Sequence, residues 1–285
     1  MYELILESPQ GDQLRFNDIG DAFTITEIQG LNPPKANIYT STSALIDGGR
    51  YTGAKVEMRT IHLAFAIERT AEANRIEMYK VFRTKQPVKL SYKSDRLDVW
   101  IEGYIQTVSP TYFAKKQIVT VEILCPFPYL KSAQEVVNEL SSIIGMFHFP
   151  FQSTSTPELV MGEIDILNII DIPNLGGIET GIIFELYAKD EVTNPKIYNY
   201  ITGEYIEIDF TMQSADLITI NTETGNKSIT LLRNGVETNL FNYLAEGSTW
   251  LQLELGNNEF CYTTQSGVLT DLNVTIRHYD LIEGV

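Results

Sequence analysis

Short runs of apolar residues at every second position recur along most of this chain, and no other feature constrains its fold as tightly. Such a period places the apolar side chains on one face of a β-strand and the polar ones on the other. The segment 2–6 alternates, a turn follows at 9–12, and residues 14–16 resume the pattern, which is typical of a hairpin. Three further sets follow in the first half: Ile61, Leu63, Phe65 and Ile67; Leu97, Val99, Ile101 and Ile105; Val119, Val121, Ile123 and Cys125.

One segment between these strands has a helical pattern instead. Thr70 is a suitable N-cap and Glu72 lies favourably in the first turn. Pro87 predicts the end of the helix. A single helix among strands indicates an α+β domain. The expected apolar stripe recurs at three-residue steps: Ala73, Ile76, Tyr79 and Phe82.

The segment from about residue 30 to 55 differs from its surroundings, and we call it the arm. Its polar run 39–43 and the pair Gly48-Gly49 leave too few apolar residues to close a core. A loop of this length is usually functional or paired with something, and β-prone residues can add to the sheet edge of a neighbour. A mobile surface loop is the alternative. The candidate contact residues of the arm are Pro33, Pro34, Ile38, Leu45 and Ile46.

The second half is predicted to be an all-β sandwich or jelly roll, because short alternating runs are separated by turn residues. The turns include Asn194-Pro195, Thr202-Gly203, Asn234-Gly235 and residues 256–258. Residues 132–144 favour a short linking helix, so we expect domains at 1–131 and 132–285. The apolar sets are Ile164 and Ile166; Ile182, Phe184 and Leu186; Ile206, Ile208 and Phe210; Ile218 and Ile220; Ile229 and Leu231; Leu251, Leu253 and Leu255; Leu272, Val274 and Ile276.

Charge is distributed unevenly between the two predicted domains. Residues 1–133 hold 16 basic and 15 acidic side chains, a net charge of +1, whereas residues 134–285 hold 5 and 22, a net charge of −17. The acidic half would repel phosphate backbones, so sequence-specific nucleic-acid binding is not expected there. No uncharged apolar stretch reaches the roughly 18 residues of a membrane span, and no signal peptide is evident, so we expect folding in a cytoplasm.

Residues that could carry chemistry are sparse. The histidines are His62, His148 and His278, and none stands in a metal-binding spacing. Cys125 and Cys261 lie in apolar runs, which favours buried thiols over a disulfide. We therefore expect no catalytic, cofactor-binding or metal-binding residues, and no cofactor. Trp250 is out of phase with Leu251 and Leu253, so it should face away from the core, where an indole can stack on a sugar ring.

The order of several motifs resembles the distal tail protein (Dit) family of long-tailed phages. In the first half these are the alternating start, Gly48-Gly49-Arg50, the run 58–63 (Met-Arg-Thr-Ile-His-Leu) and the run 125–130 (Cys-Pro-Phe-Pro-Tyr-Leu). In the second half they are 172–176 (Ile-Pro-Asn-Leu-Gly), 199–203 (Asn-Tyr-Ile-Thr-Gly), 216–222 (Asp-Leu-Ile-Thr-Ile-Asn-Thr) and 255–260 (Leu-Gly-Asn-Asn-Glu-Phe). Where the family usually has Pro-Gly, this chain has Leu255-Gly256.

The resemblance implies a tail-tube-like β-sandwich with one helix and a long arm, followed by a galectin-like sandwich. It implies a structural hub of the phage tail tip and not an enzyme: a hexameric ring, or two such rings stacked, in which the arm embraces the adjacent subunit. Its implied partners are the tail tube protein, the tail-associated lysin or fibre protein and the tape measure protein, with DNA passing through the lumen. No membrane partner is implied, and the protein would belong to the virion. The alternatives are a carbohydrate-binding module for host attachment, with Trp250 as its contact, and a cell-wall hydrolase or esterase.

Overall fold

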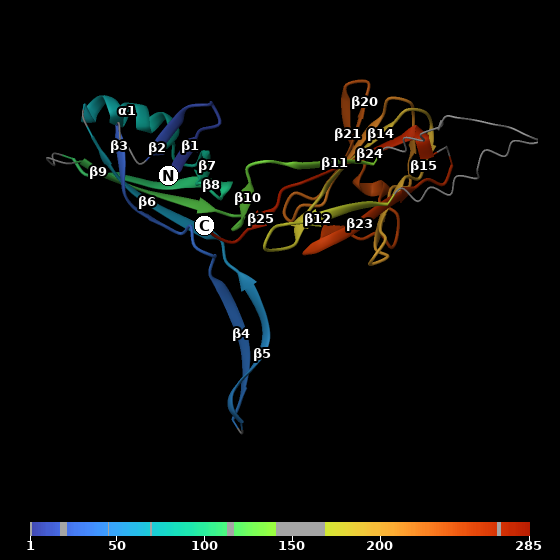
Figure 1. Ribbon diagram of the computed structural model, residues 1–285, viewed down its shortest axis with the longest axis horizontal. Coiled ribbons are helices and arrows are strands. Elements are labelled where there is room, and N and C mark those ends of the chain that lie inside the picture. The colour runs from blue at the N-terminus through green and yellow to red at the C-terminus, as the bar shows by residue number, and fades with distance from the viewer. Residues whose placement is uncertain are drawn as a thin grey trace, which may run out of the picture. The chain divides into compact units, whose positions relative to one another are not determined.

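The computed structural model describes residues 2–17, 22–44, 46–68, 70–112, 117–140, 169–266 and 269–285 (Figure 1). The chain divides into two compact units. The first holds Met1–Gln134 together with Leu281–Val285, and the second holds Glu135–Asp280. The chain thus enters the second unit three residues later than the sequence suggested and returns its last five residues to the first. The fold class is mainly β, as predicted.

The alternating segments of the first unit form one antiparallel nine-stranded sheet in the order β2-β1-β7-β8-β9-β6-β3, with β10 pairing both β8 and β25. The apolar set of β6 faces the core, as does that of β9. The predicted hairpin is β1 and β2. The bounds are β1 Glu3–Glu7, β2 Gln13–Asn17, β3 Phe23–Gln29, β6 Arg59–Ile67, β7 Pro87–Lys93, β8 Asp98–Pro110, β9 Gln117–Cys125, β10 Leu130–Ser132 and β25 Leu281–Ile282.

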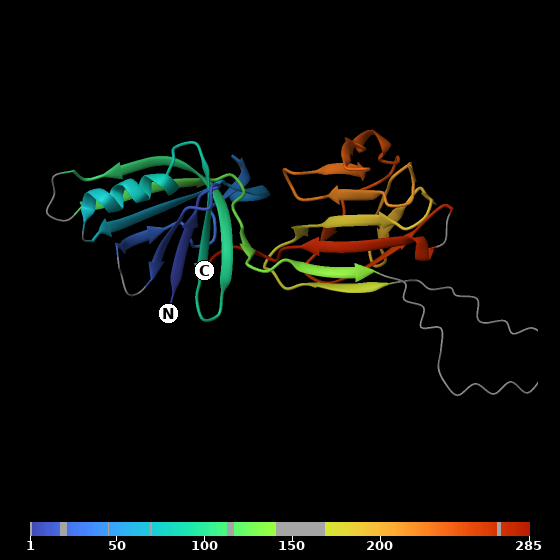
Figure 2. The same ribbon diagram turned by 90° about the horizontal axis from the view of Figure 1, so that it is seen from above.

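Helix α1 (Ala71–Val81) packs against β2 and β6 and lies along the strands of the first unit (Figure 2). The predicted stripe was right at Phe82, which is buried, and wrong at its other three members, because Ala73 is exposed, Ile76 is 57% exposed and Tyr79 is 38% exposed. The helix buries Met78 and Val81 instead. A strict three-residue step drifts by about 60° per step around a helix of 3.6 residues per turn, so its members cannot all share one face.

The N-terminus of α1 also departs from the prediction. Thr70 stands at the N-cap, but its side chain makes no capping hydrogen bond and its backbone has φ 24°. Glu72 is in the first turn as expected. The helix ends at Val81, and Pro87 opens β7. Packing of the buried turn therefore fixes this helix more than capping does.

Two main antiparallel sheets build the second unit, in the orders β11-β24-β14-β19-β20-β21 and β12-β23-β16-β17. Phe184 of β14 and Phe260 of β23 meet edge-to-face at 5.9 Å, so the two sheets share one apolar core. The bounds are β11 Val136–Leu140, β12 Ile170–Asn174, β13 Thr180–Gly181, β14 Ile183–Ala188, β15 Val192–Thr193, β16 Lys196–Asn199, β17 Tyr205–Glu207, β18 Thr211–Met212, β19 Leu217–Asn221, β20 Ser228–Arg233, β21 Val236–Asn239, β22 Gln252–Leu253, β23 Gly256–Thr263 and β24 Leu272–His278, with short 3₁₀ turns η1 Phe241–Tyr243 and η2 Leu269–Asp271.

Two local predictions in the second unit were wrong. Residues 136–140 form β11 and not a helix, because they pair along the edge of β24, from Val136 opposite His278 to Leu140 opposite Val274. Tertiary pairing overrides the helical pattern here. Residues 256–258 begin β23 and are not a turn, and Leu255 before them is 60% exposed. The expected segments 141–144, 147–151 and 164–166 lie outside the described residues.

Candidate functional site: the arm and its base

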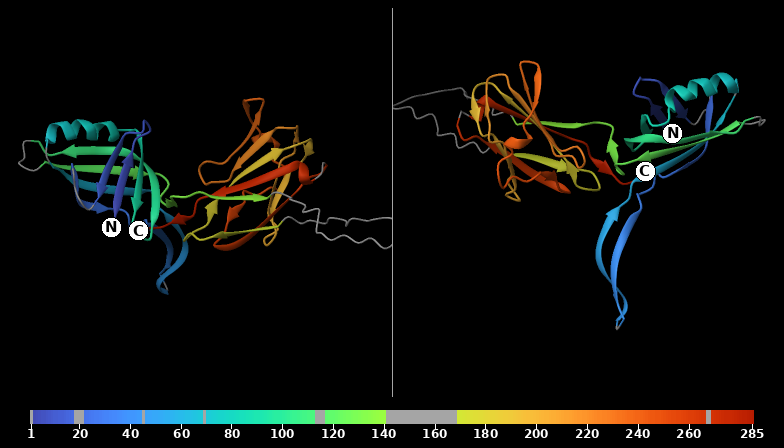
Figure 3. Two further views of the ribbon diagram at one scale, coloured as in Figure 1. Left: turned by 45° about the horizontal axis from the view of Figure 1, so that its top comes forward. Right: turned by 180° about the vertical axis from the view of Figure 1, so that it is seen from behind.

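The arm is a two-stranded antiparallel ribbon of β4 (Ala36–Ser43) and β5 (Ile46–Val56). Within the described residues, neither strand pairs with any strand of the nine-stranded sheet. The ribbon projects away from that sheet in Figures 1 and 3. It is therefore ordered as a hairpin and leaves nearly all its side chains in solvent.

The structure places the predicted arm residues in different surroundings. Pro33 is exposed and Pro34 is half-buried, and both precede β4. Ile38 lies within β4 and is 60% exposed. Ile46 is the first residue of β5, and Leu45 lies outside the described residues.

The base of the arm is fixed by one buried arginine. Arg59, the first residue of β6, is only 3% exposed. Its Nε donates to the carbonyl oxygen of Pro128 at 2.6 Å, and one terminal nitrogen donates to Gly30 at 2.8 Å and Asn32 at 3.0 Å. The other terminal nitrogen donates to the carbonyl oxygen of Glu283. Burial lowers the pKa of Arg59, but a guanidinium stays charged in proteins. One side chain thus joins the arm entrance, the segment after β9 and the last residues of the chain.

Close backbone packing tightens the same base. Gly30 has φ +89°, and a Cβ there would lie 2.2 Å from the carbonyl oxygen of Thr60. A Cβ on Gly284 would lie 2.7 Å from the ring of Pro33. The amide of Val285 donates to the carbonyl oxygen of Leu31 at 3.1 Å. The arm entrance therefore accommodates glycine and little else at these positions.

Arg59 lies within the run 58–63, where the sequence predicted no role for it. The signal was present in the alternation, because Arg59 is in phase with Ile61 and Leu63, whose side chains face the core. A charged residue on the apolar face of a strand must find polar partners, and four main-chain carbonyls supply them here.

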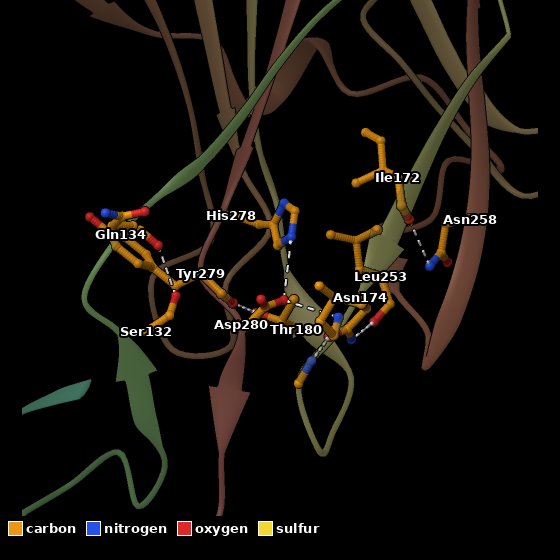
Figure 4. A network of polar contacts seen from close by, with 12 residues as sticks. Ser132, Gln134, Ile172, Asn174, Thr180, Leu253, Asn258, His278, Tyr279 and Asp280 are labelled. Atoms are coloured by element: carbon orange, nitrogen blue, oxygen red, sulfur yellow. Dashed lines mark hydrogen bonds and ion pairs between the residues drawn. The ribbon is translucent and has the colours of Figure 1, made fainter. Parts of the chain in front are cut away.

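The motifs of the second unit are also explained by buried hydrogen bonds (Figure 4). Asn174 donates to the carbonyl oxygens of Ile178 and Leu253 at 2.9 and 3.1 Å and accepts from the amide of Gly176 at 2.9 Å. Asn258 donates to the carbonyl of Glu254 at 2.9 Å and accepts from its amide at 3.0 Å. Each amide side chain thus satisfies main-chain groups of the adjoining segments.

Asp216, just before β19, is likewise held by buried hydrogen bonds. Arg233 donates to it from β20, with Nε at 2.8 Å from Oδ1, and the amide of Gln213 donates at 2.7 Å. The Arg233 guanidinium lowers the pKa of Asp216, so the carboxylate stays ionised although it is 1% exposed. This motif therefore closes a turn and presents no free carboxylate.

Two family descriptions match the chain, one in each unit. The phage tail protein RIFT-related domain matches residues 18–125, and the siphovirus-type tail component, C-terminal domain, matches residues 175–278. The chain belongs to the Dit family of siphovirus-type tail components. No curated protein matches its sequence.

Solved structures support the Dit fold over nearly the whole chain. The crystal structure of Dit from phage SPP1 aligns with a TM-score of 0.68 at 11% identity, covering 98% of both chains. Chains of the phage p2 baseplate in its activated conformation, with Ca or Sr, align with TM-scores of 0.56 and 0.54 at 15% identity, again over 98% of both. At these identities the likeness shows the fold.

The two described histidines of this Dit-family chain belong to different units. His62 is on β6, with Nδ1 3.5 Å from Glu122 on β9. His278 ends β24 and is 2% exposed, with Nε2 3.7 Å from Asp280; burial lowers its pKa. His148 lies outside the described residues. Within the described ranges no group of three or more His, Cys, Asp or Glu could hold a metal, and no helix could span a membrane.

Trp250 and the cysteines complete the predicted set. The prediction that Trp250 faces away from the core was wrong, because its side chain is half-buried and packs against the core of the second unit. Its ring lies 5.6 Å from that of Phe241 and 5.3 Å from Nζ of Lys227. Cys125 and Cys261 are buried free thiols, as predicted. Burial raises the pKa of Cys125 to about 12, so this thiol is unreactive.

Proposed function

We propose that this tail component is a ring-forming hub of the phage tail tip, in which each arm embraces the adjacent copy in a hexamer. The observation that carries the proposal is the arm, which is ordered, exposed and held at its base by Arg59. A two-stranded hairpin alone in water is marginally stable and needs a packing surface. A closed ring provides that surface to every copy and stops assembly at a defined size.

The Dit of phage SPP1 is described as a paradigm of the hub adsorption apparatus in phages that infect Gram-positive bacteria, and the p2 chains come from a baseplate. By analogy, the ring would join the tail tube protein to the tail-associated lysin or fibre protein. The tape measure protein and then DNA would pass through its lumen. The chain would be made in the host cytoplasm and carried in the virion.

The role so proposed is assembly and conduction, without catalysis. It is supported by the motif residues Arg59, Asn174, Asp216 and Asn258, whose polar atoms are taken up by hydrogen bonds that hold the fold. A catalytic group instead needs to reach a substrate. The acidic residues of the second, galectin-like unit would form a solvated rim.

Deleting residues 33–53 tests the proposal. We expect the deletion to keep both units folded, with unchanged far-ultraviolet circular dichroism apart from the lost hairpin. The mass from size-exclusion chromatography with light scattering should fall from that of the full-chain ring to that of a monomer. Rings that persist without the arm would refute the proposal.

An exposed aromatic cluster supports a second candidate, binding of host cell-wall saccharide. Phe241 and Tyr243 of η1 are 46% and 45% exposed, and the ring of Phe241 lies 5.6 Å from that of Trp250. Aromatic rings of this kind stack on sugars. The full chain should then bind wall fragments, and Trp250→Ala should reduce binding. Tyr200→Ala, a change at an exposed ring outside η1, should not. Binding that Trp250→Ala leaves unchanged would remove this candidate.

A further inference from the structure

The strand register divides the arm into two unlike faces. Residues directly opposite one another in an antiparallel pair share a face, and the face alternates along each strand. Ile38 stands opposite Ala54, and Thr40 stands opposite Tyr51, because a bulge between Tyr39 and Thr40 shifts the register by one residue. The resulting uncharged face consists of Ala36, Ile38, Thr40, Thr42, Gly49, Tyr51, Ala54 and Val56.

The opposite face carries two basic side chains. Asn37 stands opposite Lys55, Tyr39 opposite Gly53, Ser41 opposite Arg50 and, after a second register shift, Ser43 opposite Ile46. The amide of Asn37 donates to Glu57 at 2.6 Å at the root of this face. We name the two surfaces the uncharged face and the basic face of the arm.

Nothing in the described part of the first unit covers the uncharged face. Ile38 is 60% exposed and Tyr51 is 62% exposed, so the two largest side chains of this face lie mostly in solvent. The Arg59 clamp fixes the root of the ribbon, so the arm is directed away from its own core. Eight residues of β4 at about 3.3 Å each give a reach of about 26 Å, which is enough to cross a neighbouring domain.

We propose that the uncharged face of the arm is its docking surface, and that it packs on an apolar surface of a second copy while the basic face stays in solvent. This inference rests on the proposed ring and adds which face makes the contact. Each copy carries the same arm, so a head-to-tail arrangement covers every uncharged face once and leaves none over. A lipid headgroup or a phosphate backbone would instead select the basic face, where Arg50 and Lys55 lie.

Neighbouring residues of β4 provide a matched experiment. Ile38 and Tyr39 differ by one position, are 60% and 51% exposed, and point to opposite faces. We would prepare Ile38→Cys and Tyr39→Cys in the full chain and measure maleimide labelling. The background is low because Cys125 and Cys261 are buried, with the pKa of both thiols raised.

In the assembled state, Ile38→Cys should be labelled at least about ten-fold more slowly than Tyr39→Cys, because an occluded thiol must wait for the contact to open. After dilution to monomer mass the two rates should agree. Equal rates in the assembled state, or slower labelling of Tyr39→Cys, would overturn the assignment of the face.

Charged variants give a second readout that does not depend on thiol chemistry. Ile38→Asp should shift the mass from ring to monomer, and Tyr39→Asp should leave the ring intact. If both variants remain rings while the deletion of residues 33–53 is monomeric, the face assignment fails and the proposed function stands. If the deletion itself remains a ring, the proposed function fails.

Discussion

Replacing Arg59 by methionine should destabilise the first unit by about 3–5 kcal/mol. The substitution keeps a long side chain in the core and removes the donors to Pro128, Gly30, Asn32 and Glu283. A hydrogen bond from a charged group contributes about 1.5–3 kcal/mol, and an orphaned buried carbonyl costs about 1–3 kcal/mol. These contributions are not additive, and removing the buried charge itself is favourable. The expected total of about 3–5 kcal/mol is therefore smaller than their sum.

The assay is urea unfolding followed by tryptophan fluorescence. The chain has two tryptophans, Trp100 on β8 of the first unit and Trp250 in the second, so a Trp250→Phe background makes Trp100 the reporter. Arg50→Met, at an exposed arginine of the arm, is the control and should change stability by less than about 0.5 kcal/mol. A loss below about 1 kcal/mol for Arg59→Met would show that the four contacts do not hold the arm base.

Three further changes test separate parts of the fold. In the same unfolding assay, Met78→Ala should lower the free energy of unfolding by about 2–5 kcal/mol and Ile76→Ala by less than about 1 kcal/mol. The reverse order would support the predicted three-residue stripe. Gly30→Ala should lower the melting temperature much more than Gly11→Ala. Both glycines have positive φ, but only at Gly30 would backbone atoms lie within 4 Å of the added Cβ. Equal losses would show that backbone strain alone, and not the close contact, determines the effect. Burial lowers the pKa of His278 in the folded state, so the unfolded chain takes up the proton first as pH falls. The second unit should therefore lose stability below about pH 6.5. His278→Gln should reduce the dependence of the melting temperature on pH in this range.

The sequence predicted the buried sets of β6 and β9 because alternation reports directly which side chains leave water. It failed at β11, where the residues suit a helix and the edge of β24 decides the outcome. It chose the wrong face of α1, because the sheet selects Met78 and Val81, which are out of phase with the predicted series Ala73, Ile76 and Tyr79.

The arm was located from composition alone, since Pro, Gly and a polar run cannot close a core. Its base could not be predicted, because Arg59 binds carbonyls from segments up to 224 residues away in the chain. Main-chain acceptors carry no sequence signal, so only the phase of Arg59 with Ile61 pointed to its burial. The two faces of the arm likewise depend on a bulge beside Tyr39 that alternation does not reveal.

Electron microscopy of the purified full-length chain tests the central claim most directly. Class averages should show a closed ring with an open lumen, and a map should trace each ribbon of β4 and β5 onto the neighbouring copy, with Ile38 buried and Tyr39 in solvent. Single copies whose ribbons lie against their own nine-stranded sheet, with no lumen between neighbours, would contradict the account.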